Sequence, residues 1–239
     1  MKYINTQWIQ DIDFSRSEIQ CLSMENKKNY YLEGEKILQE VASLGQKPKL
    51  LVHSCCGPCS AYPLVYLFPY FDITIYFNNS NIYPEEEYTR RLNELKFLLD
   101  CYKKDYGFNI EVVETPYDNE NYNKTTLEPL KEIPEGGLRC FTCYEKRMRQ
   151  AMEYASNNNF DYFTTVMTIS RFKNAQKLNE IGERLSKEYP SVKHFFSDFK
   201  KNNGQLKRNE LVRKYKLYEQ QYCGCIYSYE EMLKRKQNA

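Results

Sequence analysis

Seven of the nine cysteines in this 239-residue chain fall into three tight clusters, and no other residues have types and spacing so well suited to chemistry. Cysteine that serves only as a small buried hydrophobic residue is scattered through a sequence, as Cys21 and Cys101 are here. Clustered thiols instead predict a reactive or ligand-binding role. The clusters are Cys55-Cys56-Gly57-Pro58-Cys59, Cys140-Phe141-Thr142-Cys143 and Cys223-Gly224-Cys225.

Composition limits the thiol chemistry to be considered. A chain of 239 residues with an odd number of cysteines can bury an ordinary core without a disulfide framework. Its first residues lack the apolar run of a signal peptide, no segment is apolar enough to span a membrane, and the mean hydropathy is −0.74. We therefore expect a soluble, cytoplasmic protein. In that reducing compartment clustered cysteines are metal ligands or catalytic thiols more often than structural disulfides.

The net charge of +2, from 34 basic and 32 acidic residues, does not indicate a nucleic-acid binder. Two local basic segments are more informative, one around the second cysteine cluster and one at residues 200–213. Such segments beside a thiol site suit a phosphate-bearing substrate, although an ordinary solvated face is the simpler interpretation. Their basic residues are Arg139, Lys146, Arg147 and Arg149, then Lys200, Lys201, Lys207, Arg208 and Arg213.

We expect two parts, an N-terminal helical extension at residues 1–46 and one α/β catalytic domain at residues 47–239. Short apolar runs bounded by proline and glycine predict strands, and longer segments with apolar residues three and four apart predict helices. The expected strands lie at residues 49–53, 71–77, 109–114, 162–166 and 192–196. The expected helices lie at residues 27–44, 58–68, 84–104, 138–157, 174–188, 208–215 and 229–236.

This alternation of strands and helices predicts a parallel sheet with helices on both faces. Ligands of such sheets bind beyond the carboxyl ends of the strands, near the point where the strand order reverses. The first cysteine cluster directly follows the strand at residues 49–53. Polar loops at residues 78–81 and 167–170 follow two other strands. We therefore expect three polar loops to meet at the first cysteine cluster.

Two cysteine pairs together supply four thiolates. Cys55 and Cys56 are adjacent, and Cys140 and Cys143 lie three residues apart near a helix start. Four thiolates suit either a zinc site or an iron–sulfur cluster. Zinc is the simpler interpretation, but it leaves Cys59 and the third cluster unexplained.

The pair Cys223 and Cys225 would close a small, strained ring if it were oxidised. Strained disulfides have the higher reduction potentials that are typical of catalytic pairs. The tetrapeptide from Cys56 to Cys59 is also identical to the thioredoxin active site, and it follows a strand and opens a helix as that motif does. The doubled Cys55 and the two further clusters speak against thioredoxin. A thioredoxin-like thiol–disulfide oxidoreductase and a zinc-stabilised RNA-binding module remain the alternatives.

Five segments, taken together, resemble the epoxyqueuosine reductases of the QueH family. Their order and spacing span roughly residues 49–228 and are far more specific than any single Cys-x-x-Cys pair. The segments are His53-Ser54-Cys55-Cys56-Gly57-Pro58-Cys59, Asn81-Ile82-Tyr83-Pro84 with Glu87, Tyr88 and Arg91, Arg139-Cys140-Phe141-Thr142-Cys143-Tyr144 with Arg147 and Met148, Thr164-Thr165 through Ser170, and Gln221-Tyr222-Cys223-Gly224-Cys225-Ile226-Tyr227-Ser228.

The resemblance implies a fold like that of the adenine-nucleotide α-hydrolases, the HUP type. It implies an enzyme that reduces the epoxide of epoxyqueuosine, at the anticodon wobble position of tRNA, to the alkene of queuosine. It further implies a 4Fe-4S cluster with a second metal ion, iron or zinc, nearby. The implied partners are the anticodon arm of the tRNA and an electron donor that the sequence does not identify, with no membrane.

Carried onto this chain, the resemblance implies that Cys223 and Cys225 form a redox-active disulfide and that Cys59 binds the neighbouring metal or acts as a resolving thiol. Asp198 is implied as a metal ligand or proton donor, although an ordinary loop carboxylate explains it equally well. Tyr222 and Lys201 are the other candidate proton donors. The implied ligands of the cluster are Cys55, Cys56, Cys140 and Cys143.

Overall fold

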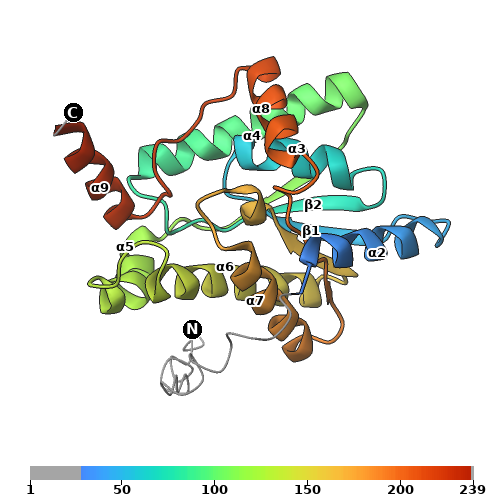
Figure 1. Ribbon diagram of the computed structural model, residues 1–239, viewed down its shortest axis with the longest axis horizontal. Helices are drawn as coiled ribbons and strands as arrows, with labels where there is room; N and C mark the ends of the chain where they lie inside the picture. Colours follow the sequence, from blue (N-terminus) through green and yellow to red (C-terminus); the bar gives the residue numbers. More distant parts are fainter. Residues whose placement is uncertain (1–27, 238–239) are drawn as a thin grey trace.

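The short apolar runs of the sequence form five strands of one parallel sheet in the order β3-β2-β1-β4-β5. The computed structural model describes residues 28–237, and Figure 1 shows it as a ribbon. The expected fold class, a parallel α/β sheet covered by helices, is confirmed. The strands are β1 (Lys49–His53), β2 (Asp72–Phe77), β3 (Glu111–Glu114), β4 (Tyr162–Thr165) and β5 (Lys193–His194).

Helices cover both faces of the sheet because the central strand buries both of its faces. Leu50 and Val52 of β1 pack in a core with α2, α3, α4 and α8, whereas Leu51 packs in a second core with α6 and α7. In Figure 1, α3, α4 and α8 lie on the opposite side of the sheet from α6 and α7. The helices are α2 (Tyr30–Ala42), α3 (Gly57–Leu67), α4 (Glu85–Tyr106), α5 (Asn119–Tyr122), α6 (Leu138–Asn157), α7 (Ala175–Glu188), α8 (Gly204–Tyr215) and α9 (Ile226–Gln237).

Helix α2 confirms the helix expected at residues 27–44 and is packed into the α/β domain. Its Leu38 and Val41 belong to the same core as β1. Gly34 permits this approach, because a Cβ atom there would lie 2.3 Å from the carbonyl oxygen of Phe196. The first 27 residues of the expected extension lie outside the described residues, and the boundary at residue 46 stays a prediction.

The segment between β3 and α6 was not expected to be helical. It forms α5, a π-helical turn (Asn123–Leu127) and a 3₁₀ turn (Glu128–Leu130). Its polar sequence has no regular apolar spacing, and only Tyr122, Thr126 and Leu127 are buried. Tertiary packing of these few side chains fixes the helical turns.

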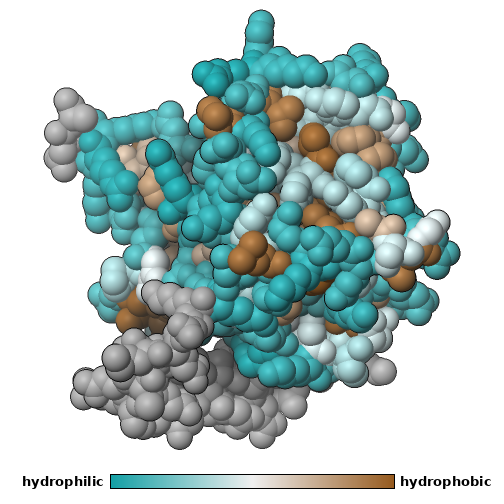
Figure 2. Space-filling view, turned by 45° about the vertical axis from the view of Figure 1, so that its right-hand side comes forward, coloured by the Kyte–Doolittle hydropathy of each residue, from teal (hydrophilic) through white to brown (hydrophobic). Residues whose placement is uncertain are grey.

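The face of the molecule drawn in Figure 2 is mainly hydrophilic. Figure 2 shows small, separate hydrophobic groups on the face that it presents. Across the described residues, no helix has the length and apolar character that a membrane crossing requires.

Candidate cysteine site

The first cysteine cluster lies at the point where the strand order reverses. From β1 the sheet extends to β2 on one side and to β4 on the other. The chain leaves β1 at His53 and enters α3 at Gly57, so Cys55 and Cys56 lie in the short loop between them. The structure therefore confirms the place predicted for this cluster at the carboxyl edge of the sheet.

Cys55, Cys56 and Cys59 form the one group of three or more potential metal ligands found among the described residues. Their Sγ atoms all lie within 4.8 Å of one another, and all three residues are buried. Local structure brings these three sulfurs together. Cys56 caps α3, and its Sγ accepts a hydrogen bond of 3.4 Å from the backbone nitrogen of Cys59. Three buried thiols at this spacing are a donor set that fits a thiophilic metal ion or part of an iron–sulfur cluster.

Buried polar side chains at the carboxyl ends of β1 and the neighbouring strands support this loop. His53 is fully buried, and its Nδ1 lies 2.8 Å from the hydroxyl of Thr165 on β4. Burial, helped by Arg147, lowers the pKa of His53 to about 3. Asn79, beyond β2, donates to the carbonyl oxygen of Ser54 at 2.7 Å. Loops after three strands therefore meet at the cysteines.

Cys140, Cys143, Cys223 and Cys225 form a second group. Burial raises the pKa of Cys140 to about 11, and the nearby thiolates of Cys223, Cys143 and Cys225 add to the increase. The hydroxyl of Tyr122 donates to the Sγ of Cys143 at 3.4 Å. Cys143 and Cys225 share a small hydrophobic cluster. All four thiols of this second group are free.

Cationic side chains link the two groups. Arg147 is only 2% exposed, and although burial lowers its pKa, the thiolates of Cys143, Cys55 and Cys223 raise it above its usual value. Lys173 is half-buried, and the thiolates of Cys223 and Cys55 likewise outweigh burial and raise its pKa. Arg147 also donates to the backbone oxygen of Cys143 at 3.2 Å and to the side-chain oxygen of Asn79, which holds the loop of the first group, so the two groups adjoin.

A C-terminal arm, residues 217–225, brings the third cysteine cluster to this place. Arg91 of α4 is 1% exposed and donates to the backbone oxygens of Cys223 at 2.9 Å and Tyr222 at 3.1 Å. The backbone nitrogen of Tyr83 donates to the oxygen of Gly224 at 2.8 Å. These contacts fix the arm along α4.

The other predicted site residues have different surroundings. Tyr222 lies on the arm, and its hydroxyl donates to the carbonyl oxygen of Tyr83. Asp198 forms an ion pair of 2.8 Å with Lys200. Within the part of the chain that the structure describes, no recorded contact joins Asp198 to a cysteine. The roles of Tyr222 and Asp198 as proton donors stay predictions.

The basic side chains around the second cluster are buried or paired within the protein. Arg139 and Arg147 are buried, and Arg149 forms ion pairs with Glu145 and Glu188. Lys146 donates to the hydroxyl of Thr126. These charges have partners inside the protein, and the interpretation of this segment as a phosphate site stays a prediction.

Tyr122, Gln220 and Lys173 are residues at the site that were not predicted. The side-chain amide of Gln220 donates to the Sγ of Cys56 at 3.2 Å and lies 3.6 Å from the Sγ of Cys59. Lys173 belongs to a polar loop after β4. A single sequence gives no signal for these roles, because each depends on a distant segment of the chain.

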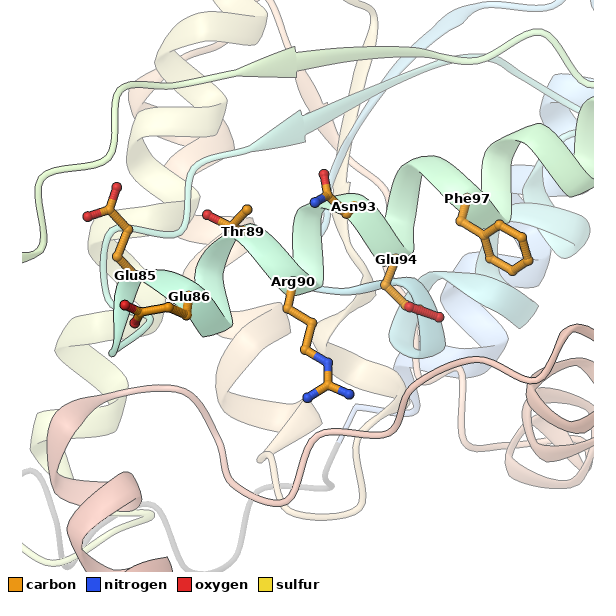
Figure 3. A pocket seen from close by; sticks show the side chains of 7 residues that line it. All are labelled: Glu85, Glu86, Thr89, Arg90, Asn93, Glu94 and Phe97. Carbon is orange, nitrogen blue, oxygen red and sulfur yellow. The ribbon is translucent and has the colours of Figure 1, made fainter.

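A separate cleft lies away from the cysteines. A cleft of about 750 Å³ runs along the outer face of α4, where Figure 3 shows Arg90 and Glu94 pointing towards the arm. Arg90 stacks on the ring of Tyr218 at 3.4 Å, and Glu94 accepts a hydrogen bond from the backbone nitrogen of Tyr218. No cysteine lines this cleft, so it is not the thiol site.

The fold and the site together define an α/β protein with a buried thiol centre at the switch point of its sheet. Comparison with known protein families matches residues 50–231 to the family described as epoxyqueuosine reductase QueH. A protein of Staphylococcus epidermidis with that name is 38% identical over 206 residues, which cover 84% of this chain and 86% of the relative. Its namesake in Streptococcus pyogenes is 38% identical over 204 residues, covering 84% and 79%.

The relative of that name in Haemophilus influenzae is 36% identical over 182 residues, which cover 75% of this chain and 71% of the relative. The chain belongs to the QueH family of epoxyqueuosine reductases. The expected class of enzyme, an oxidoreductase, is thereby confirmed.

Proposed function

We propose that this protein reduces epoxyqueuosine in the anticodon of tRNA to queuosine. The observation that carries the proposal is the meeting of all seven clustered cysteines, as two adjoining groups, in a member of the QueH family. The proposed place of action is the cytoplasm.

The reaction removes the epoxide oxygen as water and leaves an alkene, which requires two electrons and two protons. A site for it must deliver electrons, stabilise the oxygen anion that forms when the first carbon–oxygen bond opens, and protonate that oxygen. The cysteines and the cations between them supply the first two of these requirements.

We propose a 4Fe-4S cluster with Cys55, Cys56, Cys140 and Cys143 as its ligands. When bound, such a cluster supplies electrons singly. The tight packing of Cys55 and Cys56 with Cys59 supports thiolate ligation at this loop, and Cys59 is the proposed donor to a second metal ion, iron or zinc. The buried Arg147 and the half-buried Lys173 balance the negative charge of these thiolates.

We propose Cys223 and Cys225 as the redox pair. Their oxidation to a disulfide releases two electrons and two protons, the number that the reduction consumes, and an external electron donor restores the thiols. Cys223 is half-buried, so it is more accessible than the other six clustered cysteines. The charge of Lys173 beside Cys223 favours an oxygen anion there, and Tyr222 and Asp198 remain the proposed proton donors.

One experiment tests the proposal. The protein is purified and reconstituted without oxygen, its iron, zinc and acid-labile sulfide are measured, and its turnover of epoxyqueuosine-containing tRNA is followed. We expect iron and sulfide in the wild type, loss of both in Cys55→Ser, and retained iron with lost turnover in Cys223→Ser. Zinc without sulfide would favour an RNA-binding module, and a metal-free protein that reduces disulfides would favour a dithiol exchanger. Either result overturns the proposal.

A further inference from the structure

The loop between β4 and α7 presents a single aromatic side chain to solvent. Phe172 is 77% exposed, more than any other large hydrophobic residue in the described part of the chain. The loop has a defined turn: the backbone nitrogens of Phe172 and Lys173 donate to the hydroxyl and the carbonyl oxygen of Ser170 at 3.3 and 3.2 Å. Asn174 then caps α7. The ring is therefore held outward by an ordered turn.

In this loop the exposed Phe172 is followed directly by Lys173, a residue of the thiol site. The loop follows β4, at the reversal of strand order where the cysteines lie, and Figure 1 shows it projecting towards the side of α5 and α9. Although burial lowers the pKa of Lys173, the next residue, the thiolates of Cys223, Cys55 and Cys59 raise it above its usual value. Arg147 donates to the sulfur of Met167 in the same connection and to the backbone oxygen of Cys143, each at 3.2 Å, so Phe172 stands at the rim of the thiol site.

The rim is basic. The sequence has no acidic residue between Asp161 and Glu180. The guanidinium of Arg171 lies 4.9 Å from the ring centre of Phe172. Lys200, which is paired with Asp198, and Gln205 donate to the backbone oxygens of Thr168 and Ile169, which places the start of the basic segment at residues 200–213 beside the loop.

An exposed aromatic ring beside a guanidinium, on a basic rim, matches the chemistry of an unstacked nucleobase and its phosphate. We propose that Phe172 stacks on a nucleobase of the anticodon loop that neighbours the reacting base, while Arg171 binds an adjacent backbone phosphate. This inference rests on the proposed function, because it takes tRNA as the substrate.

The test measures the affinity for an anticodon stem-loop RNA and the steady-state kinetics with tRNA for Phe172→Ala. Loss of one base stack weakens binding about 5- to 150-fold. We expect the KM for tRNA to rise accordingly, with kcat and iron content unchanged. Phe172→Trp should retain the wild-type affinity, because stacking needs only an aromatic face.

Phe97→Ala is the matched control, because Phe97 is 48% exposed and lies on the outer face of α4, away from the cysteines. It should leave affinity unchanged. Arg171→Glu should weaken binding and make it less dependent on salt, since one phosphate contact is lost.

Three outcomes would overturn the inference: wild-type affinity in Phe172→Ala, an equal loss in Phe97→Ala, or slower reduction by the electron donor with unchanged RNA affinity. The last result would assign Phe172 to a protein partner. RNA affinity is measured without turnover, so the two proposals can fail separately. If the wild type is inactive but its RNA binding still depends on Phe172, the proposed function is contradicted and the proposed RNA-binding role of Phe172 is supported.

Discussion

The sulfur of Cys56 accepts hydrogen bonds from two separate parts of the chain. One comes from the backbone nitrogen of Cys59, within the same helical turn, and the other from the side-chain amide of Gln220 on the C-terminal arm. Donors to a ligand sulfur lower its negative charge, which raises the reduction potential of a bound iron–sulfur centre and supports metal affinity. Gln220 is therefore a positioning residue that couples the arm to the proposed ligand loop.

We predict that Gln220→Leu lowers the reduction potential of the bound centre and weakens metal binding about 10- to 100-fold, the usual cost of losing such a partner. Redox titration and iron analysis of anaerobically prepared protein measure the two effects. Gln221→Leu is the control, because Gln221 is the exposed neighbour and makes no recorded contact with a cysteine. Equal potentials in the two variants would show that the amide does not act on the sulfur.

At the scale of elements, the C-terminal arm depends on one glycine. Gly224 has φ 139°, and a Cβ atom there would lie 3.1 Å from the guanidinium of Arg91 and 3.3 Å from Ile82. Backbone conformations of this kind are essentially restricted to glycine. The arm can thus hold Cys223 and Cys225 in place only with glycine between them.

We predict that Gly224→Ala destabilises the arm by about 1–3 kcal/mol and makes it more sensitive to protease, because both the backbone and the crowded space oppose a side chain. Limited proteolysis and urea unfolding measure the effect. Gly107→Ala is the control, since Gly107 also has a positive φ, of 69°, but nothing lies within 4 Å of an added Cβ. A Gly224→Ala protein no more sensitive to protease than the control would contradict the crowding argument.

Elements with strong apolar periodicity were predicted closely. The helix expected at residues 138–157 and the strand at 49–53 have those bounds in the structure. The weak strand expected at 192–196 contracts to Lys193–His194 at the edge of the sheet. Elements fixed by few tertiary contacts, such as the π-helical turn, were missed. Local pattern predicts an element only when that element buries a regular face of its own.

The candidate site shows the same contrast between features that are local in the sequence and features that depend on distant segments. The three cysteine clusters, and the place of the first one at the sheet edge, are visible in the sequence, because residue type and position after a strand are local features. The close grouping of Cys59 with Cys55 and Cys56 follows from the helix start, although the sequence alone left its role open. The contact of Gln220 with Cys56 and the effect of the cysteine thiolates on the pKa of Lys173 join segments far apart in the chain, so they required the structure.

At the scale of the whole molecule, two buried histidines, His53 and His194, link stability to pH, and His194 lies away from the thiol site. His194 of β5 is 5% exposed and lies against Gly182 of α7, where an added Cβ would come within 2.3 Å of its ring. Burial, with a small contribution from Lys28, lowers the pKa of His194 to about 3. The unfolded chain, with an ordinary histidine pKa of about 6.5, takes up this proton first as the pH falls.

The free energy of unfolding should therefore decrease below about pH 6.5, with a slope of up to about 1.4 kcal/mol per pH unit from this residue. This stability is fully present above the pKa of the unfolded state and is lost as the pH falls towards the folded value. His194→Gln and His194→Phe remove the proton-binding group, so we predict a flatter dependence in both, whatever their stability at pH 7. Urea unfolding from pH 7.5 to 5.5, with equal iron content in all samples, measures the slopes. Parallel curves for wild type and both variants would mean that His194 is protonated in the folded protein, against the burial seen here.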